Sequence, residues 1–182
     1  MPVKRSFRVC VIANLRSVKD PLRAALAARY LTADSRLQIV HVGKAESEDW
    51  AQCAQSELHA NPRYTWRGPA TGGEVRRLMS SSHAMVISSI DEGGANVVSE
   101  ALACGVPVLS SHISGSIGML GPDYPGYFPT GKTRALAALL KRSETDPDFY
   151  NALVAHCNQL AHLVDSVQER QSWADLLGEW PA

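Results

Sequence analysis

Residues 86–109 read VISSIDEGGANVVSEALACGVPVL, and this stretch sets the architecture expected for the whole chain. The apolar run Ala84–Ser89 predicts a buried parallel strand, and Ala95–Ala103 favours a helix. Gly105 ends that helix before a second apolar run, Val106–Leu109. A strand, a loop, a helix and another strand in this order indicate an α/β domain built on a parallel sheet.

Two glutamates eight residues apart bracket a glycine pair in this stretch. Glycines let the backbone turn tightly and approach a ligand, and the amides that open the helix favour an anion. A carboxylate does not itself bind phosphate, so Glu92 on the loop and Glu100 in the helix are expected to accept hydrogen bonds from sugar and ribose hydroxyls. The backbone groups expected at the anion are those of Gly93, Gly94, Ala95, Asn96 and Val97.

The rest of the chain repeats the alternation of strands and helices. With residues 86–109 included, the elements alternate five times, which predicts a Rossmann-like parallel sheet with helices on both faces and ligands at the carboxyl ends of its strands. Leu22, Leu26 and Tyr30 are expected to form the buried ridge of the first helix, capped by Asp20. The other expected elements are strands at Phe7–Ala13, Leu37–Val42 and Tyr64–Trp66 and helices at Ser47–Ala60, Glu74–Ser81 and Thr133–Arg142.

The carboxyl-terminal part of the chain changes in character. Glycine and proline punctuate residues 115–131, so long regular elements are not expected there. Asp146 and Pro147 open another helix, and Trp173 and Trp180 bracket one more apolar stripe. We expect a Rossmann-like ligand-binding domain over residues 1–143 and a helical segment over residues 144–182, packed on that domain or on a missing amino-terminal domain.

The composition limits the classes of partner. Eighteen basic residues balance eighteen acidic ones, so no net field attracts nucleic acid or an anionic membrane, and any phosphate binding is local. The four cysteines and six histidines show no metal-ligand spacing, and the apolar stretch near the start is too short for a signal peptide. We expect a cytoplasmic chain with free thiols, no metal site and no cofactor.

The spacing of Glu92 and Glu100, followed by GVPVL, resembles the nucleotide-sugar half of the retaining glycosyltransferases of family 4, which have the GT-B fold. The resemblance implies that Glu92 faces the donor sugar as the catalytic residue, that Glu100 holds the ribose, and that Gly93 to Val97 meet sugar and diphosphate. The longer run EGGANVVSEALACGVPVLSSHISGSIGMLGPDYPGYFP resembles the selenosugar synthases of selenoneine biosynthesis, which couple a UDP-sugar to selenophosphate.

The loop after the first strand, ANLRSVKDP, resembles the family pattern only in part. In the family this loop reads GRL, three residues, KG, and its arginine and lysine neutralise the donor diphosphate. Lys19 matches the lysine, whereas Asn14 stands in the place of the arginine, and Arg16 is a candidate substitute. The resemblance also implies that Gly68 and Pro69 contact the base through their backbone and that Ser116 approaches the phosphates or the sugar.

Three other motifs fit less well. Residues 126–133, GYFPTGKT, match the P-loop pattern, but the prolines and glycines of the preceding GMLGPDYPG argue against the buried strand that a P-loop requires. A nucleotide hydrolase therefore stays a lesser alternative, with Lys132 expected at the exposed start of a helix. No GxGxxG follows the first strand, and GSIG is not GxSxG, so neither NAD binding nor a serine hydrolase is expected.

These observations predict the donor-binding half of a retaining, metal-independent glycosyltransferase of the hexosyltransferase type. Its donor would be a UDP-sugar, and its acceptor side would come from a missing amino-terminal domain or a partner chain, so the isolated chain is expected to be incomplete. Two alternatives stay open: a non-catalytic sugar-nucleotide-binding module or subunit that needs a partner chain, and a GT-B-type epimerase.

Overall fold

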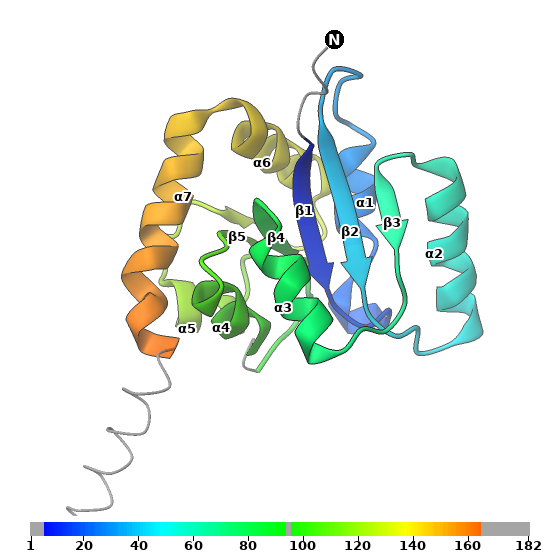
Figure 1. Ribbon diagram of the computed structural model, residues 1–182, viewed down its shortest axis with the longest axis horizontal. Helices are drawn as coiled ribbons and strands as arrows, with labels where there is room; N and C mark the ends of the chain where they lie inside the picture. Colours follow the sequence, from blue (N-terminus) through cyan, green and yellow to red (C-terminus); the bar gives the residue numbers. More distant parts are fainter. Residues whose placement is uncertain (1–5, 94–95, 165–182) are drawn as a thin grey trace, which may run out of the picture.

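A six-stranded parallel sheet forms the centre of the molecule, with the strand order β3-β2-β1-β4-β5-β6 (Figure 1). The computed structural model describes residues 6–93 and 96–164. The order reverses between β1 and β4, and ligands of open α/β sheets bind at such a point, beyond the carboxyl ends of the strands. The strands are β1 Phe7–Ile12, β2 Leu37–Val42, β3 Tyr64–Trp66, β4 Ala84–Ile87, β5 Val108–Ser111 and β6 Tyr127–Phe128.

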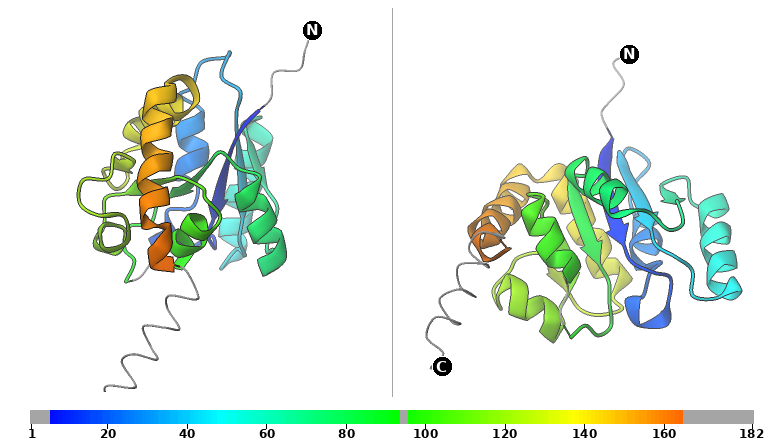
Figure 2. Two further views of the ribbon diagram at one scale, coloured as in Figure 1. Left: turned by 60° about the vertical axis from the view of Figure 1, so that its left-hand side comes forward. Right: turned by 60° about the horizontal axis from the view of Figure 1, so that its bottom comes forward.

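Helices cover both faces of the sheet. In Figure 1, α1 lies behind the sheet and α3 in front of it, and Figure 2 shows the same separation from the side. Helix α6 packs beside α1, and α7 packs against α6 and α4. The α/β, Rossmann-like class predicted from the sequence is therefore confirmed. The helices are α1 Arg23–Ala28, α2 Glu48–Ala60, α3 Gly72–Ser80, α4 Asn96–Ala103, α5 Ser114–Leu120, α6 Thr133–Thr145 and α7 Pro147–Leu160, with short 3-10 turns η1 Ser17–Lys19 and η2 Ala161–Val164.

One hydrophobic core joins the sheet to its helices. All four residues of β4 and all four of β5 are buried, as expected for central parallel strands with both faces covered. Phe149, Leu153 and Cys157 of α7 belong to the same core. None of the helices in residues 6–93 and 96–164 is long and apolar enough to cross a membrane.

Capping residues mark where several helices begin. The Ser47 side chain accepts a hydrogen bond from the Trp50 amide at the start of α2, and Asp146 accepts one from the Phe149 amide at the start of α7. Thr71 and Glu74 form a capping box at α3. Each of these local signals satisfies backbone donors that the first turn of a helix leaves without partners.

The first helix differs from the sequence prediction. Asp20 does not cap it, because the 3-10 turn η1 intervenes and Asp20 ends that turn with φ of 43°. Helix α1 ends at Ala28, so Tyr30 lies beyond it and is 57% exposed, and the expected ridge is wrong at that position. The buried face consists of small residues, Ala24, Ala25, Ala27 and Ala28.

Residues 126–133 contain no long regular element, as predicted, but they do take part in the sheet. Despite the glycines and prolines around it, this segment contains a short strand, β6, which pairs with β5. Gly126 makes the pairing possible because a Cβ there would lie 2.6 Å from the Val108 carbonyl oxygen. Lys132 is exposed at the cap of α6, as predicted.

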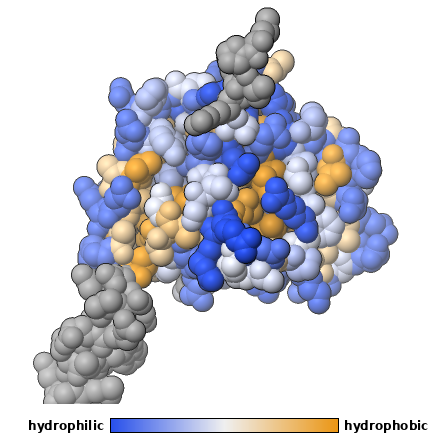
Figure 3. All heavy atoms as spheres, viewed as in Figure 1, coloured by the Kyte–Doolittle hydropathy of each residue, from blue (hydrophilic) through white to orange (hydrophobic). Residues whose placement is uncertain are grey.

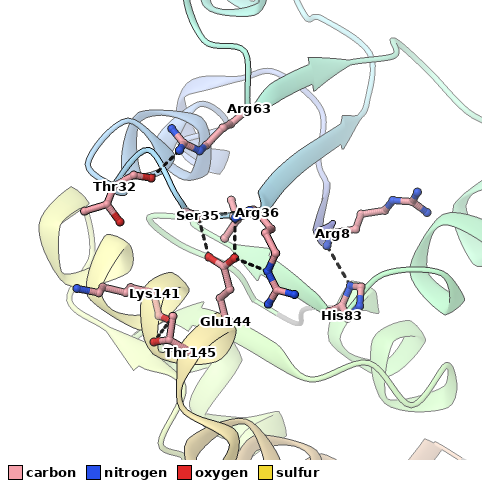
Figure 4. Close-up of polar contacts among 10 residues, drawn as sticks. Arg8, Thr32, Ser35, Arg36, Arg63, His83, Lys141, Glu144 and Thr145 are labelled. Atoms are coloured by element: carbon pink, nitrogen blue, oxygen red, sulfur yellow. Dashed lines mark hydrogen bonds and ion pairs between the residues drawn. The ribbon is translucent and has the colours of Figure 1, made fainter. Parts of the chain in front are cut away.

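A polar cluster closes the edge of the sheet where the strands begin (Figure 4). The Glu144 side chain is only 4% exposed and accepts hydrogen bonds from the Ser35 hydroxyl at 2.6 Å and the Arg36 amide at 2.6 Å. The Arg36 guanidinium adds an ion pair at 3.2 Å. Because Glu144 lies near the end of α6, this carboxylate ties α6 to the start of β2.

Candidate functional site

A pocket of about 420 Å³ lies at the carboxyl ends of β1, β2 and β3, facing the loop after β4. This is the edge at which the sequence predicts a ligand. The predicted residues that line the pocket are Asn14, Arg16, Lys19, Pro69, Glu92, Asn96 and Val97. The remaining lining residues are Ile12, Ala13, Val42, Gly43, Lys44, Ala70 and Val75.

Other predicted residues lie outside the pocket lining. Glu100 is exposed on α4, and Gly68 supports the site through its carbonyl, which accepts a hydrogen bond from the Gly43 amide at 2.9 Å. Ser116 is fully buried in α5, and its hydroxyl accepts a hydrogen bond from Ser110 at 2.7 Å. Gly93 is exposed beside Glu92. Gly94 and Ala95 lie outside the described residues, as do Trp173 and Trp180.

Lys19 and Glu92, two lining residues that come from different loops, form an ion pair. The same carboxylate oxygen, Oε1, also accepts a hydrogen bond from the Ser89 hydroxyl at 2.6 Å. The side chains are 19% and 11% exposed, so the pair is partly shielded from water. The structure thus brings together the two residues that the sequence assigns to diphosphate and sugar.

The pocket has a charged part and an apolar part. Arg16 and Lys19 line it together with Glu92 and the first residues of α4, and the amides at the amino terminus of a helix favour an anion. The apolar part suits a flat ring, which gains free energy by leaving water. It is formed by Ile12, Val42, Pro69, Ala70 and Val75.

The loops after β1 and β2 are hydrogen-bonded to each other and form one wall of the pocket. The Leu15 amide donates to the Lys44 carbonyl at 2.9 Å, and the Asn14 side chain accepts a hydrogen bond from the Lys44 amide at 3.0 Å. At Gly43 a Cβ would lie 1.8 Å from the Ala13 carbonyl oxygen, so no side chain fits there. Gly43 and Lys44 were not predicted as site residues, although a glycine directly after the strand next to β1 was an available signal.

His41 supports this wall from inside the protein. Its Nε2 donates to the Ala13 carbonyl at 2.8 Å, since a carbonyl only accepts, and its Nδ1 therefore accepts from the Tyr64 hydroxyl at 2.9 Å. Burial lowers the pKa of His41 to about 4 and raises the pKa of Tyr64. Both groups are neutral at pH 7 and hold the backbone that lines the pocket.

A second, smaller hollow of about 280 Å³ adjoins the first, sharing Val42, Pro69 and Ala70. Arg8, Arg67 and Arg77 line it, and Glu74 is the single acidic residue in its lining. In Figure 3 hydrophobic atoms lie between hydrophilic groups on this face, over β1, β2 and α3. In a chain without net charge, this concentration of arginines makes the region around the pocket positive.

In the part of the chain that the structure describes, no three His, Cys, Asp or Glu side chains lie together in a way that could hold a metal ion.

Comparison with known proteins assigns the fold and the family. The family model for glycosyl transferases group 1 matches residues 2–159. Glycosyltransferase 1 domain-containing protein 1 of Xenopus tropicalis is 24% identical over 170 residues, which cover 92% of this chain and 49% of the frog protein. The chain therefore spans about half the length of this relative.

Solved structures share the architecture at low sequence identity. Anabaena HepE in complex with UDP and glucose superimposes with a TM-score of 0.82 at 19% identity, over 96% of this chain and 49% of HepE. The pneumococcal O-GlcNAc transferase GtfA in complex with UDP and GlcNAc gives 0.77 at 18% identity, over 95% of this chain and 35% of GtfA. At these identities the likeness establishes the fold.

Proposed function

The chain belongs to the group 1 glycosyltransferases, and from this membership we propose that it is the donor-binding half of a retaining GT-B enzyme that uses a UDP-sugar. The observation that carries the proposal is the pocket that joins Lys19, Glu92 and the start of α4 to an apolar wall. A cation and helix-terminal amides match a diphosphate, a carboxylate matches sugar hydroxyls, and the apolar wall matches a base. The UDP-bound complexes of HepE and GtfA support the choice of nucleotide.

Each part of the donor then has a partner in the chain. Lys19 and Arg16 neutralise the diphosphate together with the amides of Asn96 and Val97, and Glu92 binds the donor sugar. The backbone around Pro69 contacts the base. Glu100, which is exposed on α4, is the residue proposed to accept the ribose hydroxyls.

The chemistry proposed for this half is electrostatic. When the bond from sugar to diphosphate breaks, negative charge grows on the departing phosphate oxygens. Preorganised amides and cations stabilise that charge without rearrangement, which is how an oxyanion site lowers a barrier. In this mechanism Glu92 orients the sugar while the diphosphate leaves, and no protein-bound metal takes part.

The acceptor side is proposed to come from an amino-terminal domain or a partner chain, with selenophosphate as the acceptor. The coverage of only half of HepE and of the frog relative supports this division. Ile90, 54% exposed two residues before Glu92, supports an apolar contact at the same edge. The same exposure favours the second candidate, a sugar-nucleotide-binding subunit that acts only with its partner.

Calorimetric titration tests the proposal. UDP, UDP-N-acetylglucosamine and ATP with magnesium are titrated into the wild type and into Glu100→Ala. We expect both UDP ligands to bind, and we expect Glu100→Ala to weaken them about tenfold, since it removes charged hydrogen bonds to the ribose. Asp123→Asn, an exposed change outside the pocket, serves as the control. Tight binding of ATP without binding of UDP would overturn the proposal.

A further inference from the structure

Lys19 and Ser89 bind the same oxygen of Glu92, and this sharing has a consequence for ligand binding. We propose that Lys19 exchanges partners, pairing with Glu92 in the empty site and with the donor diphosphate in the occupied site, while Ser89 is the positioning residue that keeps Glu92 in place. This inference rests on the proposed function, because it takes a nucleoside diphosphate as the ligand of the pocket.

Burial and two hydrogen bonds fix the position of Ser89. It is 2% exposed, its hydroxyl donates to Glu92 Oε1 at 2.6 Å, and its carbonyl accepts a hydrogen bond from the Ser111 hydroxyl at 2.6 Å. The backbone of Glu92 packs closely against α5 as well, since a Cβ on Gly115 would lie 2.2 Å from the Glu92 carbonyl oxygen. Glu92 therefore keeps one firm hydrogen bond when Lys19 leaves.

The Lys19 backbone is equally fixed, so the exchange involves only its side chain. The Ser88 hydroxyl lies 2.9 Å from the Asp20 carbonyl and 3.2 Å from the Lys19 carbonyl, and the Ile90 amide donates to the Val18 carbonyl at 2.8 Å. These bonds join the loop after β1 to the loop after β4. A long, flexible lysine side chain on a fixed backbone can swing between two acceptors in one pocket.

The two acceptors compete for a single cation. A diphosphate carries more negative charge than one carboxylate, so the ammonium group of Lys19 pairs with the diphosphate when the ligand enters the pocket. Its entry nevertheless costs the ion pair with Glu92, and this cost weakens the binding of UDP. The departure of Lys19 leaves Glu92 Oε1 with room for a sugar hydroxyl. Binding of the phosphates therefore prepares Glu92 for the sugar.

The test compares UDP with UDP-N-acetylglucosamine by calorimetry. Glu92→Gln removes the competitor for Lys19, so UDP is expected to bind about three- to tenfold more tightly than to the wild type. The affinity for UDP-N-acetylglucosamine relative to UDP is expected to fall by about tenfold, because a carboxylate contact to the sugar is lost. The matched control is Asp91→Asn, which removes the same charge from the exposed side chain that precedes Glu92. It is expected to change neither affinity by more than about twofold.

Two further variants separate the roles of Lys19 and Ser89. In a Lys19→Gln background, Glu92→Gln is expected to lose its effect on UDP, because no lysine is left to release. Ser89→Ala is expected to weaken UDP-N-acetylglucosamine about fivefold and to leave UDP within about twofold. A merely structural role for Ser89 would weaken both ligands alike.

The outcomes distinguish the inference from the proposed function. Wild type that binds UDP, with Glu92→Gln binding it equally or more weakly, overturns the exchange and leaves the donor site intact. Wild type that does not bind UDP overturns the proposed function. If Glu92→Gln does not fold, Glu92→Asp draws the carboxylate back by one methylene and is expected to tighten UDP in the same direction.

Discussion

The imidazole of His41 donates a hydrogen bond of 2.8 Å to the carbonyl of Ala13, so a buried side chain of β2 fixes the backbone with which the pocket begins. His41 is fully buried, and its other ring nitrogen is occupied by Tyr64. The backbone at Ala13 is therefore supported from the core. Protonation of His41 is expected to affect both the stability of the fold and the geometry of the pocket.

Stability is expected to fall as the pH drops below about 6.5. The pKa of His41 is about 4 in the folded chain against 6.5 for a free side chain, so the unfolded state takes up a proton first. The loss accumulates between these two values and amounts to roughly 3 kcal/mol in full. Urea unfolding from about pH 7 to about pH 4.5 measures it. His41→Gln should lose this slope while the exposed His59→Gln keeps it; equal slopes in wild type and His41→Gln would contradict the assignment.

Substitution of Gly43 should damage both the fold and the pocket. A Cβ at this position would lie 1.8 Å from the Ala13 carbonyl oxygen, so Gly43→Ala forces the loops after β1 and β2 apart. We expect a stability loss of about 2–4 kcal/mol and loss of UDP binding. Gly118→Ala is the matched control, since an added methyl group there would meet no neighbouring atom within 4 Å and the residue is helical. Thermal unfolding and calorimetry measure the two effects.

Glu144→Gln should destabilise the chain without changing the site. The carboxylate is almost fully buried, and it accepts two short hydrogen bonds as well as the ion pair with Arg36 (Figure 4). Loss of its charge is expected to cost about 1.5–3 kcal/mol in urea unfolding. UDP affinity should stay unchanged, because the cluster lies at the opposite edge of the sheet from the pocket. If Glu144→Gln weakens UDP binding while the protein stays fully folded, the start of the strands is energetically coupled to the pocket at their carboxyl ends.

The arginines beside the pocket should speed the arrival of an anionic ligand. Arg67→Gln and Arg77→Gln are each expected to slow UDP association about two- to fivefold at low salt, with little change in dissociation. The effect should shrink as ionic strength rises, because salt screens exposed charges. Lys141→Gln removes the same charge from the opposite edge and should leave the association rate unchanged. Stopped-flow measurements at two salt concentrations provide the test.

Much of the sheet was predictable from local sequence. The strands Leu37–Val42 and Tyr64–Trp66 were predicted with their observed bounds. Turn residues flank each short run and so limit where the strand can begin and end. Lys19 and Glu92 both follow neighbouring strands of a parallel sheet, so their meeting at one edge was predictable as well.

What escaped prediction depends on contacts between distant segments. Tyr30 is exposed because α1 already ends at Ala28, and β6 forms among glycines and prolines because β5 offers it a partner. No local pattern distinguishes Ser89, which bonds to Glu92, from Ser88, which bonds to the loop of Lys19. Tertiary packing decides both, and only the folded chain reveals them.

The contact of Gly115 with Glu92 widens the set of positions at which this protein tolerates no change. Helix α5 contributes no residue to the lining of the pocket, yet its second residue abuts the backbone of a glutamate that lines it. A substitution at Gly115 would change ligand binding through the position of Glu92, without itself contacting the ligand. Substitution of Gly115 is therefore expected to displace Glu92 even though every residue that lines the pocket is retained.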